Sequence, residues 1–116
     1  MTQYKEIPVV FYKEEGSGNE PVREWLTFLD KNCRRIIGAD LRTLQIGWPL
    51  GMPLVRNLGD GLWEVRSNIP NGIARIIFKM IRGEIVLLHS FIKKTQKTPQ
   101  DELEIAKKRA KKYVSR

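Results

Sequence analysis

Two arginines, Arg66 and Arg75, have the spacing best suited to chemistry, because they lie in β-rich segments on either side of one turn. If Pro70-Asn71 or Asn71-Gly72 is the two-residue turn of a hairpin, both arginines lie on one face of a sheet. In the first register they are direct neighbours, and two cations placed opposite each other repel, so an anion is expected between them. Glu64 on the same face partly meets this need, and the alternative interpretation is a solvated Arg-Glu-Arg surface ladder that does no chemistry.

A lysine-rich stretch follows the last β-rich segment and contains Lys93, Lys94 and Lys97. A loop at this position would place mobile ammonium groups beside the cationic face. Phe91, at the start of the stretch, would stack on a nucleobase if it faced outward. The alternative is a solvated loop with Phe91 in the core.

Other kinds of catalytic site are poorly supported. The chain has one His and one Cys, and no Cys-x-x-Cys, His-Glu-x-x-His or P-loop pattern, so we expect no metal and no cofactor. His89 lies in the apolar run Val86–Phe91, and the expectation is that it is structural.

Charge and composition restrict the partners. The 116 residues carry 21 Lys and Arg against 13 Asp and Glu, and the net charge of +8 favours polyanions such as RNA, DNA or an acidic protein. The length predicts one domain over residues 1–116. The single cysteine, Cys33, is typical of a reducing compartment, and we expect a cytoplasmic protein with no export signal and no membrane span.

The elements that would position these residues form an α+β pattern. Periodicity and turn residues predict a strand at 3–12, helices at 20–30 and 32–47, strands at 54–58, 62–67, 73–81 and 84–92, and a helix from 98 to about 113. Pro8 favours an edge position for the first strand. Thr98 is the expected N-cap of the last helix, with Pro99 at its first position. The predicted fold is an edge strand plus a four-strand antiparallel meander, with two N-terminal helices on one face and a basic C-terminal helix.

The two faces of this sheet are expected to differ. The face opposite the arginines is apolar and suits the two N-terminal helices; it carries Trp63, Val65, Ala74, Ile76, Phe78 and Met80. The sheet would therefore have a core side and a cationic side.

Three segments resemble the phage-derived HigB toxins of the RelE/ParE superfamily: Leu62–Arg66, Ala74–Phe78 and Val86–Pro99. The resemblance implies a RelE-like fold and the toxin half of a toxin–antitoxin pair. Such a toxin is an mRNA interferase that cuts message in the ribosomal A site and is silenced by a helix-turn-helix, HigA-like antitoxin. Trp63 and Ser90 depart from the residues most common in that family, and neither departure removes a cation.

The implied reaction is metal-independent attack of a ribose 2′-hydroxyl on the adjacent phosphate. By matching positions, the catalytic residues would be Arg66, Arg75, Lys93 and Lys94, with the arginines holding the phosphate. Lys93 or Lys94 would be the base. His89 is the alternative if a bulge at Arg82-Gly83 turned it to the cationic face, whereas a simple two-residue turn would place it in the core with Phe78 and Ile76. The expected RNA-binding residues are Arg56, Lys79, Phe91, Lys97, Lys107 and Lys108.

Two other functions fit the same sequence. A ParE-like protein would share the fold and inhibit DNA gyrase by binding alone. A phage nucleic-acid-binding module without cleavage would need only the basic terminal helix, which could equally serve solubility.

Overall fold

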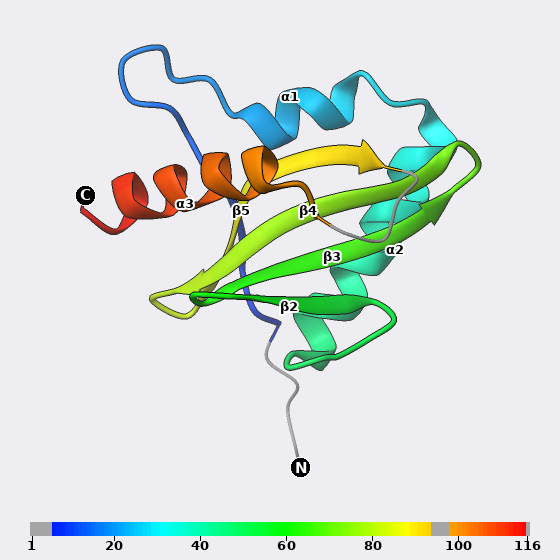
Figure 1. Ribbon diagram of the computed structural model, residues 1–116. Coiled ribbons are helices and arrows are strands. Elements are labelled where there is room, and N and C mark those ends of the chain that lie inside the picture. The colour runs from blue at the N-terminus through cyan, green and yellow to red at the C-terminus, as the bar shows by residue number, and fades with distance from the viewer. Residues whose placement is uncertain (1–5, 94–97, 116) are drawn as a thin grey trace.

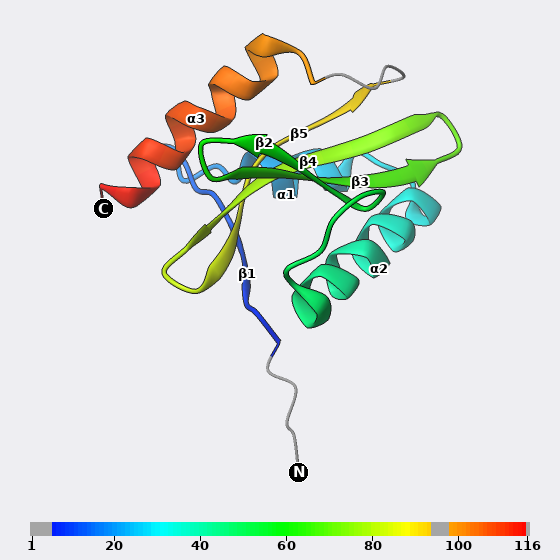
Figure 2. The ribbon, with the colours of Figure 1, turned by 60° about the horizontal axis from the view of Figure 1, so that its bottom comes forward.

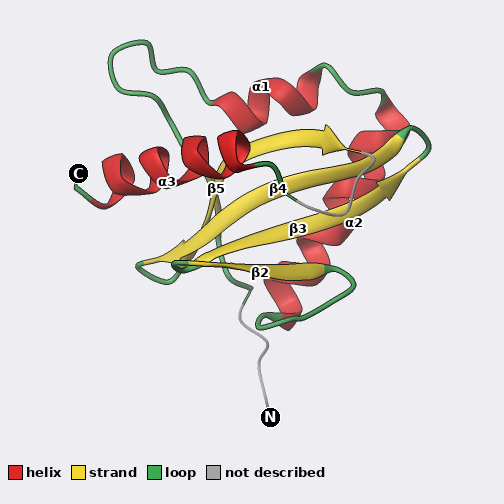
Figure 3. Cartoon of the chain, viewed as in Figure 1, coloured by secondary structure: helices red, strands yellow, loops and turns green. Residues whose placement is uncertain are grey.

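The computed structural model describes residues 6–93 and 98–115 and shows one five-stranded sheet with helices on both faces (Figures 1 and 3). The strands lie in the order β1-β5-β4-β3-β2. The elements, in chain order, are β1 Val9–Phe11, α1 Pro21–Thr27, α2 Lys31–Gly47, β2 Val55–Gly59, β3 Leu62–Ile69, β4 Gly72–Ile81, β5 Glu84–Lys93 and α3 Gln100–Val114. This α+β order confirms the predicted fold class.

The β3–β4 hairpin has the first of the two registers considered above. Ile69 pairs with Gly72, so the turn is Pro70-Asn71, and Arg66 pairs directly with Arg75. Strands β2 to β5 form the antiparallel meander, and β1 adds to β5 as a parallel edge strand. The shared face predicted for the two arginines is therefore confirmed.

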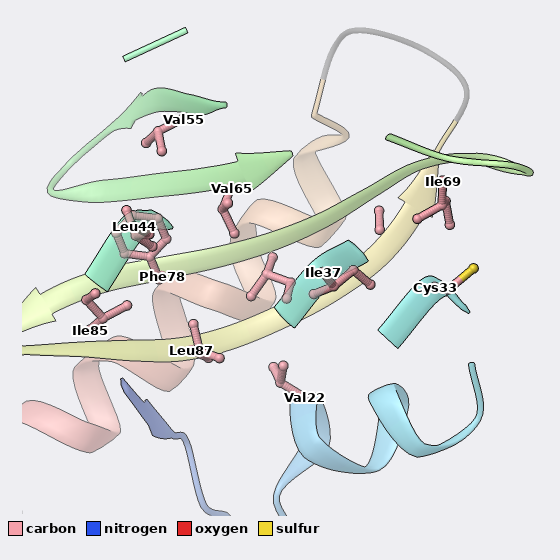
Figure 4. Packing of buried hydrophobic residues seen from close by; sticks show 12 residues of the cluster. Val22, Cys33, Ile37, Leu44, Val55, Val65, Ile69, Phe78, Ile85 and Leu87 are labelled. Carbon is pink, nitrogen blue, oxygen red and sulfur yellow. The ribbon is translucent and has the colours of Figure 1, made fainter. Parts of the chain in front are cut away.

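The face opposite the arginines packs against α1 and α2. Ile37 and Leu44 of α2 and Val22 of α1 are buried against Val65 and Phe78 of the sheet, as Figure 4 shows. Trp48, just after α2, makes edge-on ring contacts with Trp63 and Phe78 at centroid distances of 4.9 and 5.5 Å. The predicted core side of the sheet is confirmed.

The other face carries a second hydrophobic cluster beneath α3. Figure 2 shows α3 and α2 on opposite sides of the sheet. The buried residues of this cluster are Tyr12, Leu62, Ile77, Ile81, Val86, Leu88, Phe91, Ala106 and Ala110. The face predicted to be cationic is therefore also part of the core, because the small side chains of Ala106 and Ala110 let α3 pack closely on it.

A β-bulge within β5 changes which of its side chains reach this second face. The turn at Arg82-Gly83 is a simple two-residue turn, since Ile81 pairs with Glu84. Farther along the ladder, Phe78 pairs with Leu87 but Ile77 pairs with His89, so Leu88 is an extra residue. Because side chains alternate along a strand, one extra residue moves every later side chain to the opposite face.

The bulge corrects the prediction for His89. The expectation was that a simple turn would place His89 in the core with Phe78 and Ile76. Instead His89 shares the α3 face with Ile77, although the bulge lies in the middle of the strand and not at Arg82-Gly83. Phe91 and Lys93 reach the same face for the same reason.

Some element boundaries also differ from those predicted. Helix α1 ends at Thr27, and Asp30 then caps α2 by accepting a hydrogen bond from the backbone N–H of Cys33 at 2.8 Å. The N-cap of α3 is Pro99 and not Thr98, whose side chain bonds elsewhere. Within the described residues, no helix is long and apolar enough to cross a membrane.

Candidate functional site

Three arginines from three neighbouring strands surround one glutamate on the α3 face; we call Arg56, Arg66 and Arg75, together with Glu64, the arginine cluster. Arg56 of β2 pairs with Glu64 of β3, and Arg66 of β3 pairs with Arg75 of β4. Alternation along β3 puts Glu64 and Arg66 on the same face. The cluster holds three positive charges and one negative charge, so its net charge is positive.

Three members of the cluster, Glu64, Arg66 and Arg75, are buried rather than solvated. Glu64 and Arg75 have 0% of their side-chain surface exposed, and Arg66 has 8%. Oε1 of Glu64 lies 3.7 Å from Nε of Arg66 and 3.8 Å from Nη1 of Arg75. The interpretation as a solvated surface ladder is therefore wrong, because a solvated ladder would leave these charges exposed.

Thr98 contributes to the cluster from outside the sheet. Its hydroxyl donates a hydrogen bond of 2.7 Å to Oε2 of Glu64, so the two carboxylate oxygens have different partners. Thr98 lies directly before the N-cap of α3. The contact thus joins the start of α3 to the centre of the arginine cluster.

Burial lowers the pKa of Arg75, and the nearby charges of Arg66 and Arg56 lower it further. The negative charge of Glu64 acts in the opposite direction and raises it. A guanidinium group has so high a reference pKa that it stays protonated at neutral pH. Arg75 is therefore a fixed positive charge, stabilised by Glu64.

Arg66 is the member of this pair that solvent can reach. It borders a hollow of about 270 Å³ that is also lined by Ile36 and Asp40 of α2, and 8% of its side chain is exposed. Arg75 has no exposed surface in the same arrangement. Of the two paired arginines, only Arg66 therefore has side-chain surface open to solvent.

Phe91 does not face solvent, although Arg75 pairs with it across the β4–β5 ladder. Only 8% of Phe91 is exposed, and it belongs to the hydrophobic cluster under α3. The predicted stacking on a nucleobase is not possible from this position. The alternative, Phe91 in the core, is the correct one.

His89 has a partner at each ring nitrogen. Nε2 lies 3.1 Å from Oε1 of Glu102, and Nδ1 lies 3.3 Å from Nη1 of Arg109. Because a guanidinium can only donate, Nδ1 accepts in this arrangement and the proton is assigned to Nε2, which donates to Glu102. With both nitrogens engaged, His89 is poorly placed to take a proton from a substrate.

Lys93 is exposed at the end of β5 and pairs with Ile73. This pair lies two residues along the strands from the Arg75–Phe91 pair, so its side chains point to the same face. The structure therefore brings Arg66, Arg75 and Lys93 to one face. Lys94 and Lys97, also predicted to act on RNA, lie outside the described residues.

The predicted lysines Lys79, Lys107 and Lys108 form a separate basic region. They line a groove of about 630 Å³ between α3 and the sheet, above Leu62. Lys107 is already paired, since its Nζ lies 3.4 Å from Asp60 and 3.9 Å from Glu104. Arg56 belongs to the arginine cluster instead, so the described basic residues among those predicted to bind RNA fall into two groups.

Sequence reasoning missed two contributors to this face, Thr98 and Arg109. Nη1 of Arg109 donates to the carbonyl oxygen of Leu88, the extra residue of the bulge, at 2.8 Å. No local pattern marks either contact, because each joins residues far apart in the chain. Among the described residues, no three His, Cys, Asp or Glu side chains lie close enough together to hold a metal ion.

Comparison with known proteins adds one finding. A family model described as phage-derived protein Gp49-like (DUF891) matches residues 24–111, which include both arginines of the central pair and most of α3. No curated protein matches the chain.

Proposed function

Because the chain belongs to the Gp49-like family of phage-derived proteins, a toxin-like family related to RelE and HigB, we propose that it is the toxin of a type II toxin–antitoxin system. It inhibits translation as a metal-independent endoribonuclease that cleaves mRNA on the ribosome. It acts as one domain in the cytoplasm and is silenced by a helix-turn-helix antitoxin. The observation that carries this proposal is the arginine cluster, whose surplus positive charge lies at one end of the α3 face.

The reaction is a transesterification within the RNA. The ribose 2′-oxygen attacks the neighbouring phosphorus while its proton leaves to a base; the bond to the 5′-oxygen of the next nucleotide breaks, and that oxygen takes up a proton. The phosphorane between these steps carries extra negative charge. Fixed cations in a partly desolvated site stabilise such charge strongly.

Arg66 and Arg75 have different roles in this proposal. Arg66 contacts the phosphate, since part of its side chain is exposed. Arg75 stays behind it and adds positive potential without touching the substrate, because its side chain is buried. This differs from the sequence-based expectation that both guanidinium groups hold the phosphate.

Lys93 is the candidate base among the described residues. It is exposed at the end of β5, on the face that carries Arg66 and Arg75. Lys94 is the other candidate from the sequence. A weak base fits an enzyme that depends on the ribosome to orient the RNA.

The test is cleavage of a defined message on translating ribosomes by Arg66→Ala and by the wild type. We expect the variant to cleave at least about 100-fold more slowly, because it loses a charged donor to the phosphorane. Arg23→Ala is the matched control: it removes an exposed arginine of α1, 63% exposed and on the other face of the sheet, and should leave the rate unchanged.

Three results would contradict the proposal. Full activity of Arg66→Ala would remove the arginine cluster from the mechanism. An intact message combined with inhibited gyrase would indicate a ParE-like inhibitor. RNA binding by the wild type without any cut would indicate a non-cleaving module.

A further inference from the structure

Glu64 is an acidic residue in the centre of a site that we propose binds an anion, so its presence needs a physical reason. It has no exposed side-chain surface, and one of its oxygens lies within 4 Å of guanidinium nitrogens from both Arg66 and Arg75. A carboxylate here opposes binding of a phosphate by simple repulsion. Its benefit is that it can hold the guanidinium groups of the two arginines in fixed positions.

The two arginines need such a partner because they are direct neighbours on adjacent strands. Like charges at this position repel, and the repulsion grows as water is excluded. Without a counter-charge, the flexible side chains would turn away from each other toward solvent. Glu64 lies two residues before Arg66 on β3, so the two side chains share a face. Its Oε1 draws both guanidinium groups toward the same point.

Glu64 does not cancel the cluster, because Arg56 contributes a third positive charge beside it. One carboxylate among three guanidinium groups leaves a surplus of two positive charges. The surplus suits a phosphate that gains negative charge during reaction. The cluster therefore remains attractive to an anion while its members stay in place.

The orientation of the carboxylate is set from a different element. The hydroxyl of Thr98 holds Oε2 at 2.7 Å, which leaves Oε1 directed at the two guanidinium groups. A charge-assisted hydrogen bond of this length restricts rotation of the carboxylate.

We propose that Glu64 is a positioning residue, which holds Arg66 and Arg75 in the arrangement that receives the phosphate and is itself oriented by Thr98. The inference rests on the proposed RNA cleavage for its kinetic consequence. Its structural consequence, the fixed guanidinium groups, does not depend on any substrate.

The first experiment compares Glu64→Gln with Glu24→Gln. Both changes raise the net charge by one, but Glu24 is exposed on α1, on the opposite face of the sheet. We expect Glu64→Gln to lower single-turnover cleavage on saturating ribosomes about tenfold or more, because the arginines lose their arrangement. Affinity for an RNA oligonucleotide with 2′-O-methyl groups throughout, which cannot react, should stay equal or tighten up to about threefold, because local positive charge increases.

A loss of cleavage without a loss of RNA affinity separates a positioning role from a purely structural one. A structural role would weaken binding and cleavage together, along with a large fall in melting temperature. That outcome would overturn the proposal, as would cleavage by Glu64→Gln within about twofold of Glu24→Gln.

A second variant covers the case in which Glu64→Gln does not fold. Thr98→Val keeps the shape of the side chain and the charge of the cluster but removes the hydrogen bond to Glu64. We expect a smaller loss of cleavage, about threefold, with unchanged binding of the unreactive RNA. An unchanged cleavage rate would show that Thr98 does not orient the carboxylate.

Nuclear magnetic resonance of the arginine Nε–H groups tests the arrangement in the free protein. The signals of Arg66 and Arg75, assigned through Arg66→Lys and Arg75→Lys, should exchange slowly with water in the wild type. In Glu64→Gln, or in Thr98→Val to a lesser degree, they should exchange at least about tenfold faster. If they do not, Glu64 does not position them. If the wild type cleaves no message, the proposed function fails while this measurement still decides the role of Glu64.

Discussion

Arg75 illustrates at the residue scale how the environment of a side chain decides its role. Its guanidinium is fully buried beside Glu64, and burial lowers its pKa while the carboxylate opposes that effect. A charge in such a place is effective because little water screens it. It is also inaccessible, which is why we assign contact with the phosphate to Arg66.

Asp30 gives a prediction at the same scale, because it caps α2 by accepting a hydrogen bond from the backbone N–H of Cys33. That bond holds the pKa of Asp30 below its usual value. We expect Asp30→Ala to lower the melting temperature by about 5 °C at pH 7, measured by circular dichroism.

The pH dependence of this effect has a definite sign. Because the folded-state pKa is lowered, the contribution of the charge is present above the unfolded pKa of about 4 and is lost as the pH falls through the folded pKa. The wild type and Asp30→Ala should therefore converge in stability toward pH 2. Asp30→Asn keeps a hydrogen-bond acceptor without titrating, and its difference from Asp30→Ala should stay constant over this range. A constant difference for the wild type as well would refute the assignment.

The bulge in β5 is the feature that matters most at the element scale. It turns His89, Phe91 and Lys93 toward α3, and the guanidinium of Arg109 from α3 donates to the carbonyl of Leu88 at the extra residue. The same side chain lies 3.4 Å from Glu14 and contacts His89. A single side chain thus links α3, the bulge and the loop after β1.

We predict that Arg109→Met destabilises the fold by about 1–3 kcal/mol, because a part-buried carbonyl loses a charged donor. Thermal melting should show this loss, and hydrogen exchange should localise it to amides near the bulge. Lys108→Met is the matched control, since it removes an exposed charge from the neighbouring position of α3. Equal melting temperatures for the two variants would exclude a role of Arg109 in supporting the bulge.

At the scale of the whole molecule, two regions bring basic side chains together in a chain whose net charge is +8. The central pair of the arginine cluster is buried and partly compensated by Glu64, whereas Lys79, Lys107 and Lys108 line the groove beside α3. In our proposal the first region acts on the scissile phosphate. The second supplies affinity that does not depend on sequence.

The salt dependence of RNA binding tests this division. A lysine that contacts a single-stranded phosphate contributes about 0.7 to the slope of log K against log salt concentration. Lys108→Ala should reduce the slope by about that amount, whereas Lys107→Ala should reduce it less, because Lys107 is already paired with Asp60 and Glu104. Fluorescence titration with an RNA oligonucleotide at several salt concentrations measures both slopes. Equal reductions in the two variants would show that the acidic partners do not matter.

The amino-acid sequence by itself determined the order of elements and the face shared by Arg66 and Arg75, which is the same in either of the two hairpin registers; the structure chose the register with Pro70-Asn71 as the turn. These features follow from local rules: turn residues limit the possible hairpin registers, and side chains alternate along a strand. The side of the sheet that faces α1 and α2 was predictable for the same reason. Val65, Ile76 and Phe78 occupy alternate positions along their strands, so their side chains point to one face.

Only the tertiary structure decided what covers that shared face. Three features depend on residues that are distant in the chain. They are the bulge at Leu88, the burial of Arg75, and the contacts that Thr98 and Arg109 make with the sheet. A local pattern contains no information on such contacts, because they depend on how α3 packs against the sheet. For this reason the sequence identified the arginines, but only the packed fold revealed that Glu64 lies buried between them.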